Sequence, residues 1–139
     1  MGLVYANIEL VNAGEIFLAQ KGYIKQTEVK RMNVNALVDT GASTLTINEN
    51  IKIQLDLLEL DEREVILADG SRQKLKVVGP IEIRFENRKT TTNAVVLPSA
   101  DKILLGVIPI EDMDILIDAK QEKLIVNPET PYLASLSLR

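Results

Sequence analysis

The sequence of 139 residues contains neither cysteine nor histidine. Without cysteine the chain can form no disulfide, no thiolate metal site and no cysteine nucleophile. Without histidine it lacks the commonest zinc ligand and both the Ser-His-Asp and Cys-His catalytic arrangements. Acid–base chemistry near neutral pH would therefore depend on carboxylates, lysine or tyrosine, and we expect no metal and no other cofactor.

Long apolar runs are also absent. No stretch of about 18 apolar residues could span a bilayer, and the N-terminus lacks the basic-then-apolar layout of a signal peptide. These features predict a cytoplasmic protein. The formal net charge is −4, with acidic and basic residues interleaved along the chain, which argues against nucleic acid or a membrane surface as the partner.

The composition is that of an ordinary globular protein, with 46% hydrophobic and 26% charged residues. A chain of this length can bury a stable hydrophobic core without disulfide bonds. We therefore expect one domain spanning residues 1–139.

Short runs of Ile, Leu and Val broken by turn residues indicate a mainly β protein. In the first half, the expected strands are "LVYANIELVN" (3–12), "EIFLAQKGYI" (15–24) after a turn at 12–14, "EVKRMNVNALVD" (28–39) and "STLTI" (43–47). From Asn48 onward the apolar residues fit a helical stripe and strand alternation equally well, so periodicity leaves 48–58 open.

The second half predicts hairpins. "EVILADGSRQKLKVV" (64–78) forms one with its tip at residues 68–71, because Asp69-Gly70 suits a tight turn. Gly79-Pro80 is expected to break the run before the alternating strand "IEIRFE" (81–86), a turn at "ENRK" and the return strand "TTTNAVVLP" (90–98). The chain then continues with the short strand "KILLG" (102–106), a helix at 108–113 and a last hairpin around 119–122.

Asp39 is the most informative residue, because it directly follows the apolar run Ala36 to Val38. Such a run is typical of a strand buried on both faces, where an unpaired charge is costly. Thr40 offers a hydroxyl, and Gly41 permits a turn that aims backbone N–H groups at the carboxylate. The trio can hold a carboxylate in a fixed place, although Asp-Thr-Gly is also an ordinary strand-ending turn.

Several motifs occur together in one order over roughly residues 27–128: "ALVDTGAST", "TINENI", "VILADGSRQKLKVVG", "AVVLPSADKILLG" and "VIPIEDMDILIDAKQEKLIVNP". In this order the chain resembles the retropepsin-like aspartic proteases. The resemblance implies a closed β-barrel with one or two short helices, and it favours a short helix or turn near 48–58. It does not account for residues 1–26, interpreted as N-terminal strands, or for the C-terminal tail 129–139.

The resemblance also implies roles for individual residues. Asp39 would be catalytic, and Ala42, which stands where single-chain pepsins commonly have Ser, would favour a working pH nearer neutral. The loop residues supporting the site would be Thr40, Gly41 and Ala42. The hairpin tip, or flap, that closes over substrate would be Ala68, Asp69, Gly70 and Ser71, and the second apolar-Gly motif would be Leu104, Leu105 and Gly106.

Peptide hydrolysis of this kind requires two carboxylates that share a proton, yet the chain has a single Asp-Thr-Gly. We therefore expect a homodimer that places Asp39 of each subunit at its two-fold axis and cuts an extended polypeptide. Two alternatives remain open: a non-catalytic dimerisation or peptide-binding module on the same fold, and an unrelated β-barrel. "EDMD" (111–114) lacks the spacing of a calcium loop and is interpreted as a solvated helix end.

Overall fold

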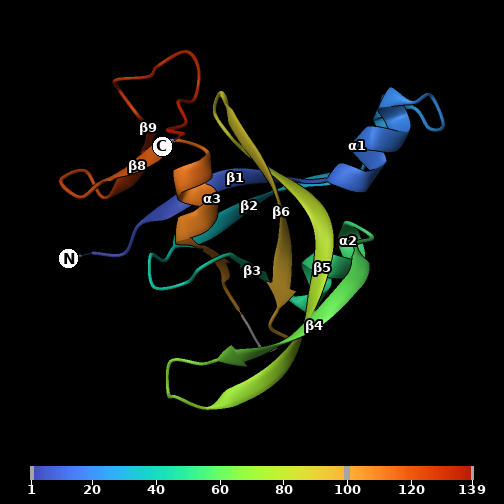
Figure 1. The fold of residues 1–139 in the computed structure, drawn as a ribbon, viewed down its shortest axis with the longest axis horizontal. Coiled ribbons are helices and arrows are strands. Elements are labelled where there is room, and N and C mark those ends of the chain that lie inside the picture. The colour runs from blue at the N-terminus through green and yellow to red at the C-terminus, as the bar shows by residue number, and fades with distance from the viewer. Residues whose placement is uncertain (1, 99–100, 139) are drawn as a thin grey trace.

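The computed structural model describes residues 2–98 and 101–138 and is mainly β (Figure 1). The strands are β1 (Tyr5–Asn12), β2 (Arg31–Val38), β3 (Leu45–Ile47), β4 (Leu58–Ile66), β5 (Arg72–Phe85), β6 (Arg88–Val96), β7 (Ile103–Leu105), β8 (Ile115–Asp118) and β9 (Lys123–Val126). The helices are α1 (Ala13–Gln20), α2 (Glu49–Gln54) and α3 (Val107–Asp112), with a 3₁₀ turn η1 (Gln26–Glu28). Residues 99 and 100, within the stretch "AVVLPSADKILLG", lie outside the described residues.

Six strands close into a barrel. They are hydrogen-bonded in the order β1-β2-β7-β3-β6-β5, and the additional pairing of β1 with β5 completes the ring. Every second residue of each strand points inward, so β5 contributes Ile81, Ile83 and Phe85 to the core. β1 contributes Ile8 and Leu10 in the same way. The expected closed barrel is confirmed.

β4 lies outside the ring and pairs only with the first half of β5. The two strands form the hairpin that extends at the bottom of Figure 1, far from α1 at the upper right. The expected hairpin tip is confirmed, because Leu67 to Ser71 connect the two strands. One continuous strand, β5, thus belongs to the hairpin at one end and to the barrel at the other.

The expected break at Gly79-Pro80 was wrong. β5 continues through both residues, and only its register against β6 shifts, between Val78 and Ile81. Proline has no N–H to donate to a neighbouring strand, so an irregularity in the ladder accommodates it.

The expected strand at 15–24 was also wrong, because α1 occupies most of it and adds a third helix to the two expected. Asn12 begins the helix: its side-chain oxygen accepts a hydrogen bond from the N–H of Glu15 at 3.0 Å. Phe17 and Leu18 stay exposed, so the apolar residues that resembled a strand are not core residues.

The other two helices and the last hairpin lie where the sequence predicts them. Asn48 caps α2 as expected, α3 lies where the helix at 108–113 was expected, and β8 pairs with β9 as the last hairpin. Ala36 is fully buried, but Leu37 and Val38 are only half-buried in the single chain, so the expectation of burial on both faces is confirmed only for Ala36. Within the described residues, no helix has both the length and the apolar character needed to cross a membrane.

Candidate active site

Asp39 lies immediately beyond the end of β2, where this strand runs parallel to β7. Its backbone N–H donates a hydrogen bond to the carbonyl oxygen of Leu105 at 3.0 Å. On the other side of β2, the N–H of Val38 donates to the carbonyl oxygen of Val4 at 2.8 Å. The backbone that carries Asp39 is therefore held between β7 and the residues that lead into β1.

The loop after Asp39 turns back on the carboxylate. The N–H of Gly41 donates to Asp39 Oδ1 at 2.9 Å, and the N–H of Ala42 donates to the Asp39 carbonyl oxygen at 3.1 Å. The first bond orients the side chain through the Gly41 N–H, as the sequence suggested, and the second closes the backbone turn. Asp39 remains half-buried, whereas Thr40 and Gly41 are exposed in the single chain.

The second apolar-Gly motif packs against this loop. Beyond Gly106, the N–H of Val107 donates to the carbonyl oxygen of Ala42 at 2.9 Å, and the N–H of Ile108 donates to that of Ser43 at 3.0 Å. The first turn of α3 thus continues the support that β7 gives to Asp39. Leu105 and Gly106 are buried behind the loop, whereas Leu104 faces the same space as Asp39.

That space is a groove of about 720 Å³ between the Asp39 loop and the β4–β5 hairpin. One wall is formed by the loop and the strands behind it: Asp39, Gly41, Ala42, Ser43, Thr44, Thr46, Val95, Leu97 and Leu104. The other wall is formed by the hairpin: Arg63, Glu64, Val65, Ile66, Leu67, Ala68 and Leu75. The groove therefore has an aspartate on one side and a hairpin of mixed polar and apolar character on the other.

Only one of the four expected flap residues, Ala68, lines the groove. Asp69, Gly70 and Ser71 form the exposed tip beyond it. Asp69 Oδ1 accepts hydrogen bonds from the Ser71 hydroxyl at 2.5 Å and from its N–H at 2.8 Å, and these bonds lower the pKa of Asp69. In this position of the hairpin, the tip stabilises its own turn, and its contact with a substrate stays a prediction.

Comparison with models of known protein families shows which family the chain resembles. The family model described as "gag-polyprotein putative aspartyl protease" matches residues 25–110, from the segment before β2 to α3. The chain belongs to this retropepsin-like family. None of the curated proteins compared with the chain matches it.

The matched segment places the retropepsin-like signatures in one continuous stretch that holds both walls of the groove. It includes the Asp39 loop, the β4–β5 hairpin and the Leu104 to Gly106 motif. β1, α1 and the β8–β9 hairpin lie outside it. β1, the strand that closes the barrel between β2 and β5, thus comes from residues outside the matched segment.

Sequence reasoning missed most of the groove wall, notably Arg63 to Leu67 on the hairpin and Leu75 opposite them. For Arg63, Val65 and Leu67 the signal was present, because alternate residues of a hairpin share a face and the expected tip at 68–71 fixes the register. Glu64 and Ile66 lie between them and border the groove without such a signal. The contributions of Thr46, Val95 and Leu97 had no such signal. They come from β3 and from the end of β6, which only the barrel topology brings together.

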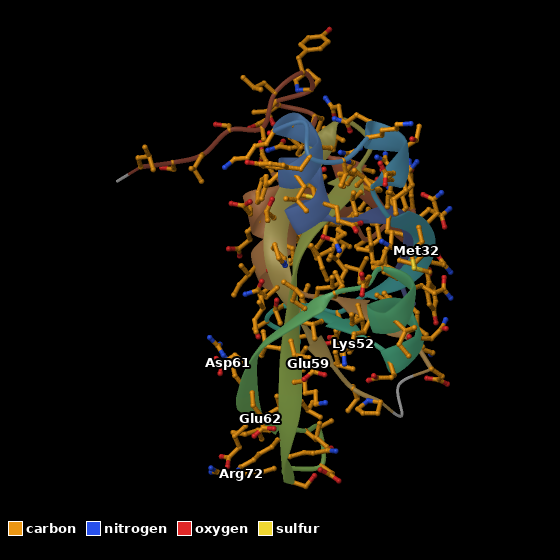
Figure 2. The ribbon with its side chains drawn as sticks, turned by 90° about the vertical axis from the view of Figure 1, so that its right-hand side faces the viewer. Met32, Lys52, Glu59, Asp61, Glu62 and Arg72 are labelled. Carbon is orange, nitrogen blue, oxygen red and sulfur yellow. The ribbon has the colours of Figure 1, made fainter. Side chains whose placement is uncertain are left out.

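A cluster of charges joins the base of the β4–β5 hairpin to α2, and Figure 2 labels two of its members, Glu59 and Lys52. The Glu59 carboxylate lies 2.6 Å from Lys52 Nζ and 3.0 Å from Lys76 Nζ. Hydrogen bonds from Lys52 and Lys76 lower the pKa of Glu59, and the bond to Glu59 raises that of Lys52. The base of the β4–β5 hairpin is therefore tied to α2.

The acidic segment 111–114 is not simply a solvated helix end. Asp114 accepts hydrogen bonds from Asn127 Nδ2 at 2.9 Å, from the Thr130 hydroxyl at 2.6 Å and from the Ser135 N–H at 2.9 Å. These bonds, with the guanidinium of Arg88 3.9 Å away, lower the pKa of Asp114 to about 2. Asp114 thus anchors the C-terminal tail. Nowhere in residues 2–98 and 101–138 do three potential metal-ligating side chains gather as a group that could hold a metal ion.

Proposed function

We propose that the protein is an aspartic endopeptidase that acts as a homodimer, with Asp39 of each subunit supplying one of two catalytic carboxylates. The observation that carries the proposal is the position of Asp39: its carboxylate is oriented by the Gly41 N–H and lines a groove large enough for a peptide segment. Membership of the aspartyl protease family supports the same chemistry.

The mechanism needs a second carboxylate close to the first. One carboxylate, unprotonated, accepts a proton from the attacking water, while its protonated partner donates a proton to the carbonyl oxygen of the scissile bond. Two carboxylates about 3 Å apart do not both ionise easily, so the pair holds one proton and titrates as a unit.

The described residues of one chain place no free second carboxylate in the groove. Among the described residues that line the groove, the only other carboxylate belongs to Glu64, and it lies 2.8 Å from Arg72 Nη1 in an ion pair. A second copy of the chain would supply an identical Asp39 across a two-fold axis. In the family, the residue in the position of Thr40 joins the two loops across this axis, and Thr40 is exposed in the single chain, where such a contact would cover it.

The substrate would be an extended polypeptide. Most of the side chains that line the groove are apolar, and the hairpin that forms one wall presents a strand that an extended peptide can lie beside. Movement of the flap would admit the peptide and then exclude water from the site. The charge cluster at Glu59 would hold the flap base while its outer part moves.

The test is incubation of the purified chain with an unfolded protein such as β-casein, followed by mass spectrometry of the products. We expect cleavage by the wild type and none by Asp39→Asn. Asp56→Asn is the matched control: Asp56 is exposed after α2 with a positive φ of 51°, which Asn tolerates. It should cleave as the wild type does.

The same samples distinguish the principal alternative, a peptide-binding module without catalysis. Sedimentation velocity at micromolar concentration should show a dimer for the wild type and for Asp39→Asn. A dimer that binds peptides but yields no products that depend on Asp39 would favour the module. A chain that stays monomeric even with a peptide substrate would contradict the shared-carboxylate enzyme.

A further inference from the structure

Arg63 lies on the face of the flap that looks into the groove. In the antiparallel pairing of β4 with β5, Arg63 stands opposite Leu75, and paired residues project from the same face. Leu75 is buried and lines the groove together with the half-buried Val65 and Leu67, which follow Arg63 by two and four residues. The next residues in each strand, Glu64 and Lys74, are paired with each other and alternate to the opposite face. Lys74 does not line the groove, whereas Glu64 borders it with its carboxylate paired to Arg72.

Arg63 is the only cation among the described residues that line the groove. The Glu64 carboxylate is paired with Arg72 at 2.8 Å, and Figure 2 shows Arg72 near the outer end of the hairpin. The nearest acidic partner of Arg63 is Asp61, whose carboxylate is 4.0 Å from Arg63 Nε, with both side chains largely exposed. An exposed pair at that distance contributes little, so the guanidinium is free to bind another carboxylate.

A guanidinium presents parallel N–H donors that match the two oxygens of a carboxylate. Ala68 is five positions after Arg63 along the hairpin, a separation of at most about 17 Å. The guanidinium is therefore displaced from the end of the flap along the groove. A substrate side chain that reaches it would belong to a residue to one side of the cleaved bond.

We infer that Arg63 is a specificity residue that selects polypeptides with a Glu or Asp several residues from the cleaved bond, beside apolar residues that fill the rest of the groove. The inference rests on the proposed peptidase function. In the proposed homodimer each subunit contributes one Arg63, so an acidic residue is favoured on either side of the cleaved bond.

The test begins with the cleavage products of β-casein and of a peptide library, which should be enriched in Glu and Asp at one or more positions flanking the cut. A peptide with Glu at the preferred position is then compared with its Gln counterpart. For the wild type we expect kcat/KM to be about fivefold higher for the Glu peptide, as an exposed but well-aligned charge pair would give. Arg63→Gln should reduce this ratio to about one.

Lys74→Gln is the matched control. It removes one positive charge from the same hairpin, at a position that does not line the groove. Its Glu-to-Gln ratio should equal that of the wild type, whereas a general effect of flap charge would lower the ratio in both variants. No enrichment of acidic residues in the wild-type products, an unchanged ratio in Arg63→Gln, or an equal loss in Lys74→Gln would overturn the inference.

Binding separates this inference from the proposed catalysis. Fluorescence anisotropy measures the affinities of a labelled Glu peptide and of its Gln counterpart. The proteins compared are the Asp39→Asn variant, which is expected to bind without cleaving, and the double variant that also carries Arg63→Gln. Preference for the Glu peptide that disappears in the double variant supports the role of Arg63 even if the wild type cleaves nothing. Equal affinity of Asp39→Asn for both peptides overturns it.

Discussion

Gly106 lies against the backbone of Thr44 with no room for a side chain between them. A Cβ at position 106 would be 2.6 Å from Thr44 N, 2.7 Å from the Ala42 carbonyl oxygen and closer still to the Thr44 carbonyl oxygen. The φ of Gly106 is −87°, which any residue adopts. Glycine is therefore required here by close packing, because the loop that carries Asp39 is pressed onto the start of α3.

Replacement of Gly106 by Ala should push the Asp39 loop away from α3. We expect a loss of about 2–3 kcal/mol in the free energy of unfolding, because the clash is with backbone that cannot rotate aside. Chemical denaturation measures it. Gly22→Ala serves as a control at a site with open space but a positive φ of 82°, and it should cost about 1–2 kcal/mol from backbone strain alone. A change near zero for Gly106→Ala would contradict the packing described.

Asn12 joins α1 to the barrel and to α2. Its side chain is buried, donates through Nδ2 to the carbonyl oxygens of Leu55 at 2.9 Å and Asp56 at 3.3 Å, and caps α1 through its oxygen. Asn12→Ala removes the cap and leaves the buried Leu55 carbonyl without this donor, so we expect a loss of about 2–3 kcal/mol. Asn48→Ala removes a cap alone, at α2, and should cost about 1 kcal/mol. Equal effects in denaturation experiments would show that the bonds to Leu55 and Asp56 contribute nothing.

Asp114 should make the free energy of unfolding depend on pH in the acid range. Its pKa in the folded chain, about 2, is below its ordinary value of 3.8, so the unfolded chain binds the proton more readily. The stabilisation is present above about pH 4 and is lost as the pH falls through about 2. Asp114→Asn should flatten this part of the curve of thermal unfolding midpoint against pH. If the variant and the wild type fall in parallel between pH 5 and pH 2, the bonds from Asn127, Thr130 and Ser135 are not the cause.

Local signals in the sequence were enough to predict the Asp39 loop, the flap hairpin and α3. Asp-Thr-Gly after an apolar run, Asp69-Gly70 between two strands and Pro109 in a first helical turn each act through the backbone of neighbouring residues. The same is true of Asn48, although the choice between helix and strand after it needed the family resemblance. These features follow from short-range chemistry and do not depend on the rest of the fold.

The features that were missed depend on distant parts of the chain. α1 forms where an apolar segment looked like a strand, because Asn12 is fixed by Leu55, which is 43 residues away, and can then cap a helix. Asp114 acquires its partners only when residues 127–135 fold back against it. Thr46 and Val95 meet in the groove wall because β3 runs parallel to β6, and neither residue type indicates such a role.

The central claim, that two Asp39 residues from two chains make one active site, is tested most directly by mixing. Wild-type and Asp39→Asn chains are combined at constant total concentration, allowed to exchange subunits, and assayed for cleavage of β-casein. With equal amounts of each, random pairing leaves about a quarter of the dimers with two aspartates, so activity should fall to about a quarter of the all-wild-type value. A fall to about half, in proportion to the wild-type chains present, would show that each chain works alone and would contradict the account.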